Sequence, residues 1–133
     1  MGQFKSGSAD TIYDQIGNIP SLFRSSFDEL ITQTQITQTA TDYNTSNSRN
    51  IGDYDILMIS LIVEDYIREG TTIPRNTLTY FGSTGTSLRT TTGGVDIEVV
   101  IRYKSATKIE MKYNASATKN VKVRIDALKL KSA

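Results

Sequence analysis

The feature that most constrains the fold is a strict alternation of apolar and polar residues toward the C-terminus. From Val95 to Leu130 the chain reads VDIEVVIRYKSATKIEMKYNASATKNVKVRIDALKL, and three stretches of it carry apolar side chains at every second position. Because successive side chains of a strand point to opposite faces, this pattern predicts three strands, each with one face in a core and one in water. Turns at Ser105–Ala106 and at residues 114–120 would join them into an antiparallel meander. A slip of the apolar phase at Leu128 predicts a β-bulge near Ala127.

Segments upstream of this run add further strands. Ile56–Val63 is the most apolar run of the chain, too short to span a bilayer and rich in β-branched residues, so it predicts a strand buried on both faces. Residues 32–39 alternate threonine with glutamine, which predicts a polar strand at a sheet edge. A loop is expected near Asn44–Asn50, a short strand carries Pro74 near its start, and residues 82–94 predict a mobile loop.

The N-terminal segment follows a helical rhythm instead. Residues 9–17 predict a short helix, and residues 20–31 predict a second, longer one. A helix this short, with one apolar stripe, is not stable by itself in water. It must therefore dock on the sheet or on copies of itself. The sequence therefore predicts a helical attachment and trimerisation segment at 1–31 and, at 32–133, an antiparallel β-sandwich, jelly-roll-like, with six to eight strands. The stripe offered as an oligomer interface consists of Leu22, Phe23, Phe27, Leu30 and Ile31.

The composition removes several kinds of chemistry. The 133 residues suffice for one domain with a substantial core, and they include neither cysteine nor histidine. A disulfide scaffold, thiolate catalysis, a Ser-His pair and a zinc site of the usual nitrogen or sulfur kind are therefore excluded. We expect a protein that is not an enzyme, with no cofactor and no metal site.

Two groups of acidic residues offer alternatives to that expectation. Asp53 and Asp55 would share one face of a strand, as ligands of a hard cation do, but a calcium loop needs a much denser pattern of oxygen ligands. We therefore favour a polar start to the strand. Glu64, Asp65 and Glu69 resemble a carboxylate cluster for glycoside cleavage, which needs two opposed acids at a defined separation. Three acids at the end of a buried strand are more often an exposed turn, and we favour that interpretation.

The charge of the chain is unevenly distributed. Residues 95–133 hold 9 basic and 4 acidic side chains, a net charge of +5, whereas residues 1–94 hold 6 basic and 10 acidic ones, a net charge of −4. A nucleic-acid surface would use the basic side chains for phosphates, but it would also place aromatic residues on the same face. Tyr103 and Tyr113 are in phase with the core side, so we expect a solvated outer face that could also meet an acidic surface of a neighbouring copy. The basic side chains concerned are Lys104, Lys108, Lys112, Lys122 and Arg124.

The stretch IGDYDILMISLIVED, followed by TTIPRNTL, resembles small β-sandwich domains of bacteriophage virion proteins. These domains occur chiefly near the C-terminal ends of tail-fibre and baseplate receptor-binding proteins. In them a Y-D-x-L-x-I strand precedes a short I-P strand, a variable loop and alternating strands. The corresponding parts of this chain are Tyr54–Ile59, Ile73-Pro74, the 82–94 loop and the alternating run after Val95. The resemblance therefore covers roughly residues 50–131.

The resemblance implies a homotrimer on the virion, often with an N-terminal helical stalk, and it supplies no catalytic residues. We therefore expect a non-enzymatic virion protein, made in the host cytoplasm, that acts as a trimeric fibre or receptor-binding component of the tail or baseplate. Tail-fibre tips normally sit on long chains, so a capsid head fibre or decoration protein is the alternative, and a nucleic-acid-binding β module or a glycan-cleaving enzyme is a more distant one.

The expected partners follow from this interpretation. They are further copies of the chain, other virion proteins and a host cell-surface glycan, with nucleic acid unlikely. Membrane insertion is not expected, because no apolar run approaches the roughly 20 residues of a membrane span. Recognition residues commonly lie on loops, and large amphipathic side chains serve as anchors. The candidate ligand-binding loop residues are Tyr80, Phe81, Leu88 and Arg89.

Overall fold

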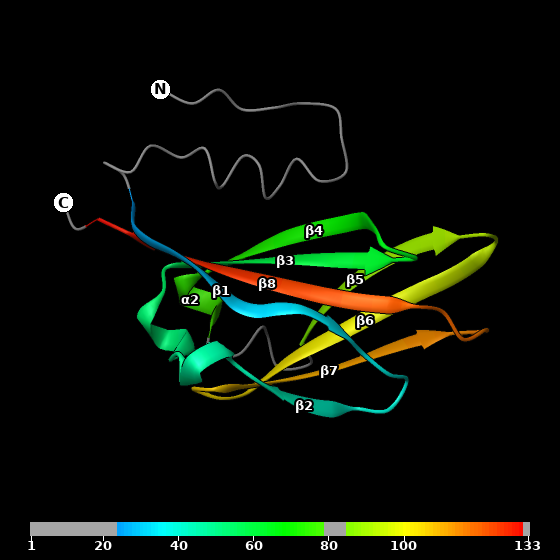
Figure 1. Ribbon diagram of the computed structural model, residues 1–133, viewed down its shortest axis with the longest axis horizontal. Coiled ribbons are helices and arrows are strands. Elements are labelled where there is room, and N and C mark those ends of the chain that lie inside the picture. The colour runs from blue at the N-terminus through cyan, green and yellow to red at the C-terminus, as the bar shows by residue number, and fades with distance from the viewer. Residues whose placement is uncertain (1–23, 79–84, 132–133) are drawn as a thin grey trace, which may run out of the picture.

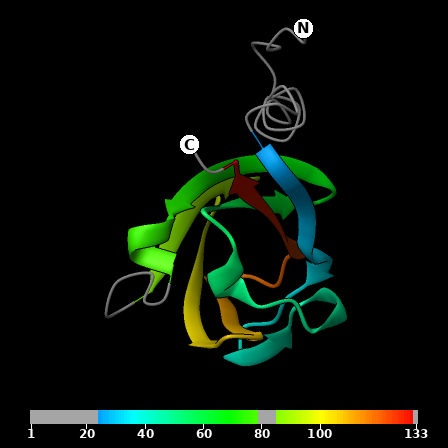
Figure 2. The same cartoon turned by 90° about the vertical axis from the view of Figure 1, so that its left-hand side faces the viewer.

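Eight strands form two antiparallel sheets in residues 24–78 and 85–131, which the computed structural model describes (Figure 1). Sheet A has the strand order β1-β8-β3-β4 and sheet B the order β2-β7-β6-β5; they face each other across one apolar core, as in a β-sandwich (Figure 2). Within the described ranges, three short helices lie in the connections: η1 (Ser46–Ser48), η2 (Ile51–Asp53) and α2 (Arg75–Leu78). The strands are β1 Arg24–Gln35, β2 Thr41–Asn44, β3 Ile56–Val63, β4 Tyr66–Pro74, β5 Thr86–Thr92, β6 Val95–Ser105, β7 Lys108–Ala115 and β8 Val121–Leu130.

The strand order combines hairpins with pairs of strands that lie far apart in the sequence. β3–β4, β5–β6 and β6–β7 are hairpins, whereas β1–β8, β3–β8 and β2–β7 are long-range pairs. A jelly roll has the same three long-range pairs, but it would also pair β3 with β6 and β4 with β5. The prediction of a mainly β, antiparallel protein with six to eight strands is confirmed. The likeness to a jelly roll is limited to the three long-range pairs.

β3 lies in the interior of sheet A, between β8 and β4. Leu57, Ile59 and Leu61 are fully buried in the core between the sheets. The alternate residues Met58 and Ile62 belong to the opposite face, yet they are only 2% and 3% exposed. The predicted burial of this strand on both faces is confirmed.

The alternating residues after Val95 form strands as predicted, but not one meander. β6 and β7 are neighbours in sheet B, whereas β8 lies in sheet A between β1 and β3. Residues 116–120 therefore carry the chain from one sheet to the other, and the predicted meander is wrong at its third strand. The reason is that alternation specifies which face of a strand is buried and does not specify its neighbour.

The predicted helix at residues 20–31 is wrong from Arg24 onward, where β1 begins. The pairing of β1 with β8 shifts register between Glu29 and Ile31, so Leu30 is an extra residue in β1. Leu30 and Ile31 both reach the core in consequence, with exposed fractions of 0% and 3%. Two consecutive inward residues break the period of two, and this produced the spacing that resembles a helix.

The division of the chain at residue 31 falls inside β1, so residues 24–31 belong to the sandwich. The predicted helix at 9–17, and the first residues of the second one, lie outside the described residues. The predicted bulge near Ala127 is also misplaced, because β8 pairs with β3 in continuous register from Leu128 to Val121. Ala127 keeps the inward phase, and Leu128 belongs to the outer face of sheet A.

Two segments near the middle of the chain differ from the prediction. Pro74 ends β4 rather than beginning a strand, and α2 follows it at once. β4 is an edge strand of sheet A, where a missing N–H costs little. Within the predicted mobile loop, Thr86–Thr92 is strand β5, because β-branched threonines suit a strand and Leu88 fills the core. The turn itself is formed by Gly93 and Gly94, which have φ values of 58° and 77°.

An ion-pair network with one fully buried member crosses the outer face of sheet A, which is the face turned away from the core. Asp126 of β8 is fully buried, and Arg124 contacts both of its carboxylate oxygens, with Nε at 3.1 Å and an Nη at 3.4 Å. Arg124 also bonds Glu29 of β1 at 2.8 Å. Burial raises the pKa of Asp126, the hydrogen bonds and charge of Arg124 oppose this, and the charge of Glu29 adds to it.

Asp126→Asn is therefore expected to gain stability over the wild type as the pH rises. A carboxyl whose pKa is raised by folding contributes stability below its ordinary pKa and loses that contribution as the pH rises through the folded pKa. Asparagine imitates the neutral form, so its advantage should grow between about pH 4 and pH 7. Urea unfolding at several pH values measures this, with the exposed strand residue Asp42→Asn as control. A difference that does not change with pH would contradict the prediction.

Candidate functional site

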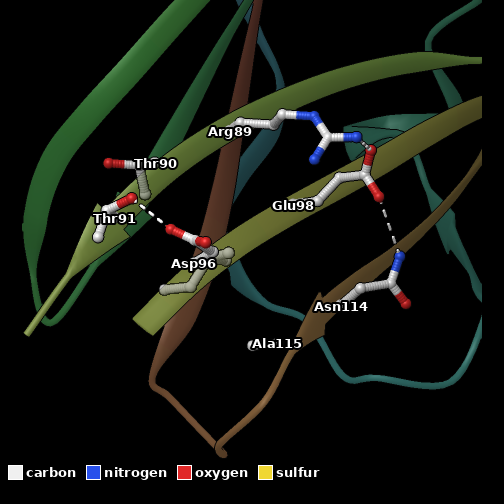
Figure 3. A pocket seen from close by; sticks show the side chains of 8 residues that line it. Arg89, Thr90, Thr91, Asp96, Glu98, Asn114 and Ala115 are labelled. Carbon is white, nitrogen blue, oxygen red and sulfur yellow. Dashed lines mark hydrogen bonds and ion pairs between the residues drawn. The ribbon is translucent and has the colours of Figure 1, made fainter. Parts of the chain in front are cut away.

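A pocket lies at sheet B, over β5, β6 and β7 (Figure 3). Its volume is about 650 Å³, within the roughly 300–1,000 Å³ of small-molecule sites. The three strands are hydrogen-bonded neighbours, so the positions of the lining side chains are fixed by strand register. The lining residues are Arg89, Thr90, Thr91, Asp96, Ile97, Glu98, Asn114 and Ala115.

A row of three polar side chains crosses the strands at this pocket. Arg89 lies opposite Glu98, which in turn lies opposite Asn114. An Nη of Arg89 donates to Glu98 at 2.6 Å, and Nδ2 of Asn114 donates to the other carboxylate oxygen at 3.3 Å. The Arg89 side chain is 75% exposed while that of Glu98 is 23% exposed. Glu98 thus holds the row in place, and the guanidinium presents further N–H groups to solvent.

A second polar pair lies one step closer to the β5–β6 turn. The Thr91 hydroxyl donates to Asp96 at 2.6 Å, and the two residues are register partners. Beyond them, a Cβ added to Gly93 would lie 3.7 Å from Nζ of Lys119, so this amine lies beside the turn. The pocket therefore offers acceptors from two carboxylates and donors from a guanidinium and an amide, with an amine nearby.

This combination suits a neutral ligand with many hydroxyl groups. Sugar hydroxyls can donate to carboxylates and accept from guanidinium and amide N–H groups at the same time. A purely anionic ligand would meet Asp96 and Glu98, and a purely cationic one would meet Arg89. The geometry therefore favours a glycan or another uncharged polar molecule over a charged one.

Of the four predicted ligand residues, the structure places only Arg89 in this pocket. Leu88 is 5% exposed and belongs to the core, so its prediction as a ligand contact is wrong. Tyr80 and Phe81 lie outside the described residues. Sequence reasoning missed the acids and Asn114 as site residues. Alternation placed Asp96 and Glu98 on the outward face, but their proximity to Arg89 depends on a strand that was predicted to be a loop.

The predicted oligomer interface is partly overturned. Leu30 and Ile31 are buried in the core of their own chain, so they have no side-chain surface to offer a neighbouring copy. Phe27 is half-buried and lies opposite Leu128 of β8. Leu22 and Phe23 lie outside the described residues.

The predicted basic strip is not one surface. Lys104, Lys108 and Lys112 belong to sheet B, whereas Lys122 and Arg124 belong to β8 in sheet A. The outer faces of two packed sheets point in opposite directions, so the two groups do not form one continuous surface. Several of these cations also have partners within the chain. Lys104 lies 3.5 Å from Glu110, and Lys122 lies 2.7 Å from Asp65.

Three of the acidic residues singled out in the sequence have structural roles. Glu64 and Asp65 form the β3–β4 turn with φ values of 52° and 67°, which two-residue hairpins require. Asp55 accepts from Arg75 at 3.0 Å and from the backbone N–H of Leu130 at 2.8 Å. The expectation of an exposed turn at Glu64 and Asp65 is confirmed.

Over residues 24–78 and 85–131, no three acidic residues gather in a way that could hold a metal ion. Nor does any helix described there have the length and apolarity needed to cross a membrane.

Comparisons with protein-family models, curated proteins and solved structures gave no significant match. The resemblance to phage virion domains therefore stays a prediction.

Proposed function

We propose that this protein is a non-enzymatic structural component of a bacteriophage virion, acting as a trimeric fibre or receptor-binding part of the tail or baseplate. Two features support the proposal. The sequence from Tyr54 to Pro74, which carries the resemblance, forms the β3–β4 hairpin and the chain just before it. The body is a two-sheet antiparallel structure, as that resemblance implies.

The polar pocket over β5, β6 and β7 is the observation that carries the receptor-binding part. Its donors and acceptors are held by cross-strand hydrogen bonds, so little side-chain freedom is lost when a ligand binds. A host cell-surface glycan is the ligand class that this pocket fits best. Contacts to one pocket would be weak, and three copies held together would increase the avidity.

A capsid head fibre or decoration protein remains the alternative for the same fold. A nucleic-acid-binding module is less favoured, because the basic residues lie on two outward faces that point apart and several are paired with acids. Phosphate binding needs a continuous positive surface that follows the nucleic acid backbone.

Replacing Arg89 and Asn114 together by alanine is expected to reduce glycan affinity roughly tenfold or more, since each substitution would remove a polar contact to the ligand worth about 1–3 kcal/mol. The measurement is binding to a panel of purified bacterial surface polysaccharides. Lys104→Ala is a matched control, because Lys104 is also a cation of sheet B paired with a glutamate on a neighbouring strand, outside the pocket. Its affinity should equal that of the wild type.

Two outcomes would contradict the proposed function. Equal polysaccharide affinity in the wild type and the Arg89→Ala, Asn114→Ala variant would remove the pocket as a receptor site. A stable monomer of 14.7 kDa in native mass spectrometry at micromolar concentration would remove the trimer. Antibody labelling of phage particles distinguishes the remaining positions: label on the tail supports the proposal, whereas label on the capsid supports the alternative.

A further inference from the structure

Two rows of polar side chains stand on the outer face of sheet B, and the pocket lies between them (Figure 3). One row consists of Arg89, Glu98 and Asn114, and the other of Thr91 and Asp96. The members of a row are register partners on neighbouring strands, so each row crosses the strands. The two rows lie two residues apart along each strand, a separation of about 7 Å. The pocket is therefore a groove that runs across the strands and not along them.

The floor of the groove is formed by backbone. Between the two rows lies a third set of register partners, Thr90, Ile97 and Ala115, which also line the pocket. Ile97 belongs to the core and Ala115 packs against it, so the side chains of this set point away from the groove. Three neighbouring strands lie about 4.8 Å apart, which gives a floor about 10 Å long from β5 to β7.

The described residues leave both ends of this groove open. At one end, β5 is the last strand of sheet B, and no described strand continues that sheet beyond it. At the other end, β2 pairs with Lys108–Met111 of β7 and does not reach Ala115. The residues that follow Ala115 are small and exposed, namely Ser116, Ala117 and Thr118. A site for the end of a sugar chain would be closed on one side, whereas this groove is open on two.

Polar groups that can contact a ligand are spread along the groove. At the β5 end, the Arg89 side chain is 75% exposed and has N–H groups besides the one that Glu98 accepts. In the middle, Asp96 accepts from Thr91 with Oδ1, and its Oδ2 accepts no hydrogen bond from a described residue. At the β7 end, Asn114 donates from Nδ2 and keeps its amide oxygen for an incoming hydroxyl. A ligand that crosses the groove meets all three groups, whereas a single terminal sugar would reach only part of them.

We propose that this groove binds internal units of a linear, uncharged polysaccharide, whose chain crosses β5, β6 and β7 and leaves the groove at both ends. The inference rests on the proposed glycan-binding function and specifies the form of the glycan. The polysaccharide lies nearly perpendicular to the strands, with one row of polar side chains on each side. Neither its reducing end nor its non-reducing end takes part in recognition. Every repeat unit of a long chain can therefore occupy the groove.

Chain length distinguishes internal from terminal recognition. The uncharged polysaccharide of the panel that binds best is partly hydrolysed, and a long and a short fraction compete with the labelled intact polymer at equal mass concentration. Fractions that differ about tenfold in length carry similar numbers of internal units, but the short fraction has about tenfold more chain ends. We expect the long fraction to compete at least as well as the short one. Stronger competition by the short fraction, in proportion to its ends, would overturn the proposal.

Substitutions at the two ends of the groove test whether the ligand crosses it. Arg89→Ala removes donors at the β5 end, and Asn114→Ala removes an amide at the β7 end. Each is expected to weaken binding of the long fraction about two- to tenfold, as the loss of one hydrogen bond does. Arg102→Ala is the matched control and should bind as the wild type does, because Arg102 is an exposed arginine of β6 outside the groove. Weaker binding in only one of the two groove variants would overturn the crossing.

The outcomes separate this inference from the proposed function. Absence of binding to every polysaccharide of the panel would overturn both. Binding that depends on chain ends, or on one end of the groove alone, would overturn the crossing and leave the receptor function intact. Binding of charged polysaccharides alone would overturn the uncharged ligand. The chain-length experiment uses the unmodified protein, so it decides the question even if a variant fails to fold.

Discussion

Leu61→Ala is expected to lower the free energy of unfolding by about 2–5 kcal/mol. Leu61 is 0% exposed on β3, with Val123 of β8 on one side and Glu69 of β4 on the other. Removing its side chain leaves a cavity in the core that backbone hydrogen bonds on both sides prevent from closing. Urea unfolding of the wild type and the variant measures the loss.

Leu130→Ala is the matched control, because it deletes the same atoms at a position that is 41% exposed. Leu130 lies at the end of β8, where truncation leaves no cavity, so its cost should stay below about 1 kcal/mol. Equal losses of stability for the two variants would contradict the burial of Leu61 in the core. A large loss for Leu61→Ala and a small loss for Leu130→Ala is the result that one apolar core between the sheets requires.

Gly85→Ala is expected to destabilise the protein by roughly 2–5 kcal/mol, because two penalties add. Gly85 has a φ of 91°, which side chains with a Cβ rarely adopt. A Cβ at this position would also lie 2.6 Å from the carbonyl oxygen of Ile101 in β6, a backbone atom that cannot move alone. The substitution would therefore push β5 away from β6 at the end where they begin to pair.

Gly94→Ala separates the two penalties. Its φ is 77°, but a Cβ there would meet nothing within 4 Å. Only the backbone strain remains, at a cost of about 1–2 kcal/mol. Thermal unfolding of both variants should give a clearly larger decrease in Tm for Gly85→Ala. Equal decreases in Tm for the two variants would mean that the contact with Ile101 contributes nothing to stability. They would also contradict the pairing of Thr86 with Ile101.

The local pattern of the sequence predicted strands well where the side chains alternate without interruption. β6 and β7 show the inward and outward residues that were expected, with Ile97, Val99 and Met111 in the core. Prediction was wrong where the alternation is interrupted. The extra residue Leu30 in β1 imitated a helical spacing, and the small side chains of β5 gave no visible period.

The candidate site could be predicted only in part. The outward positions of Asp96 and Glu98 follow from alternation, and Arg89 was singled out as a large side chain of a supposed loop. Their contact requires β5 to pair with β6 in one particular register, and a shift by one residue would reverse the faces. Asn114 joins the site through the second pairing, from β6 to β7.

The sequence by itself determined that this protein is built from antiparallel strands and which side chains of most strands face a core. Only the tertiary structure placed β8 in the opposite sheet from β7, divided the basic residues between two outward faces and brought Arg89 beside Glu98. The physical reason is that alternation arises from the geometry of one strand, with a period of two residues. The choice of neighbour depends instead on which distant strands bury the most apolar surface together, and no local pattern encodes that choice.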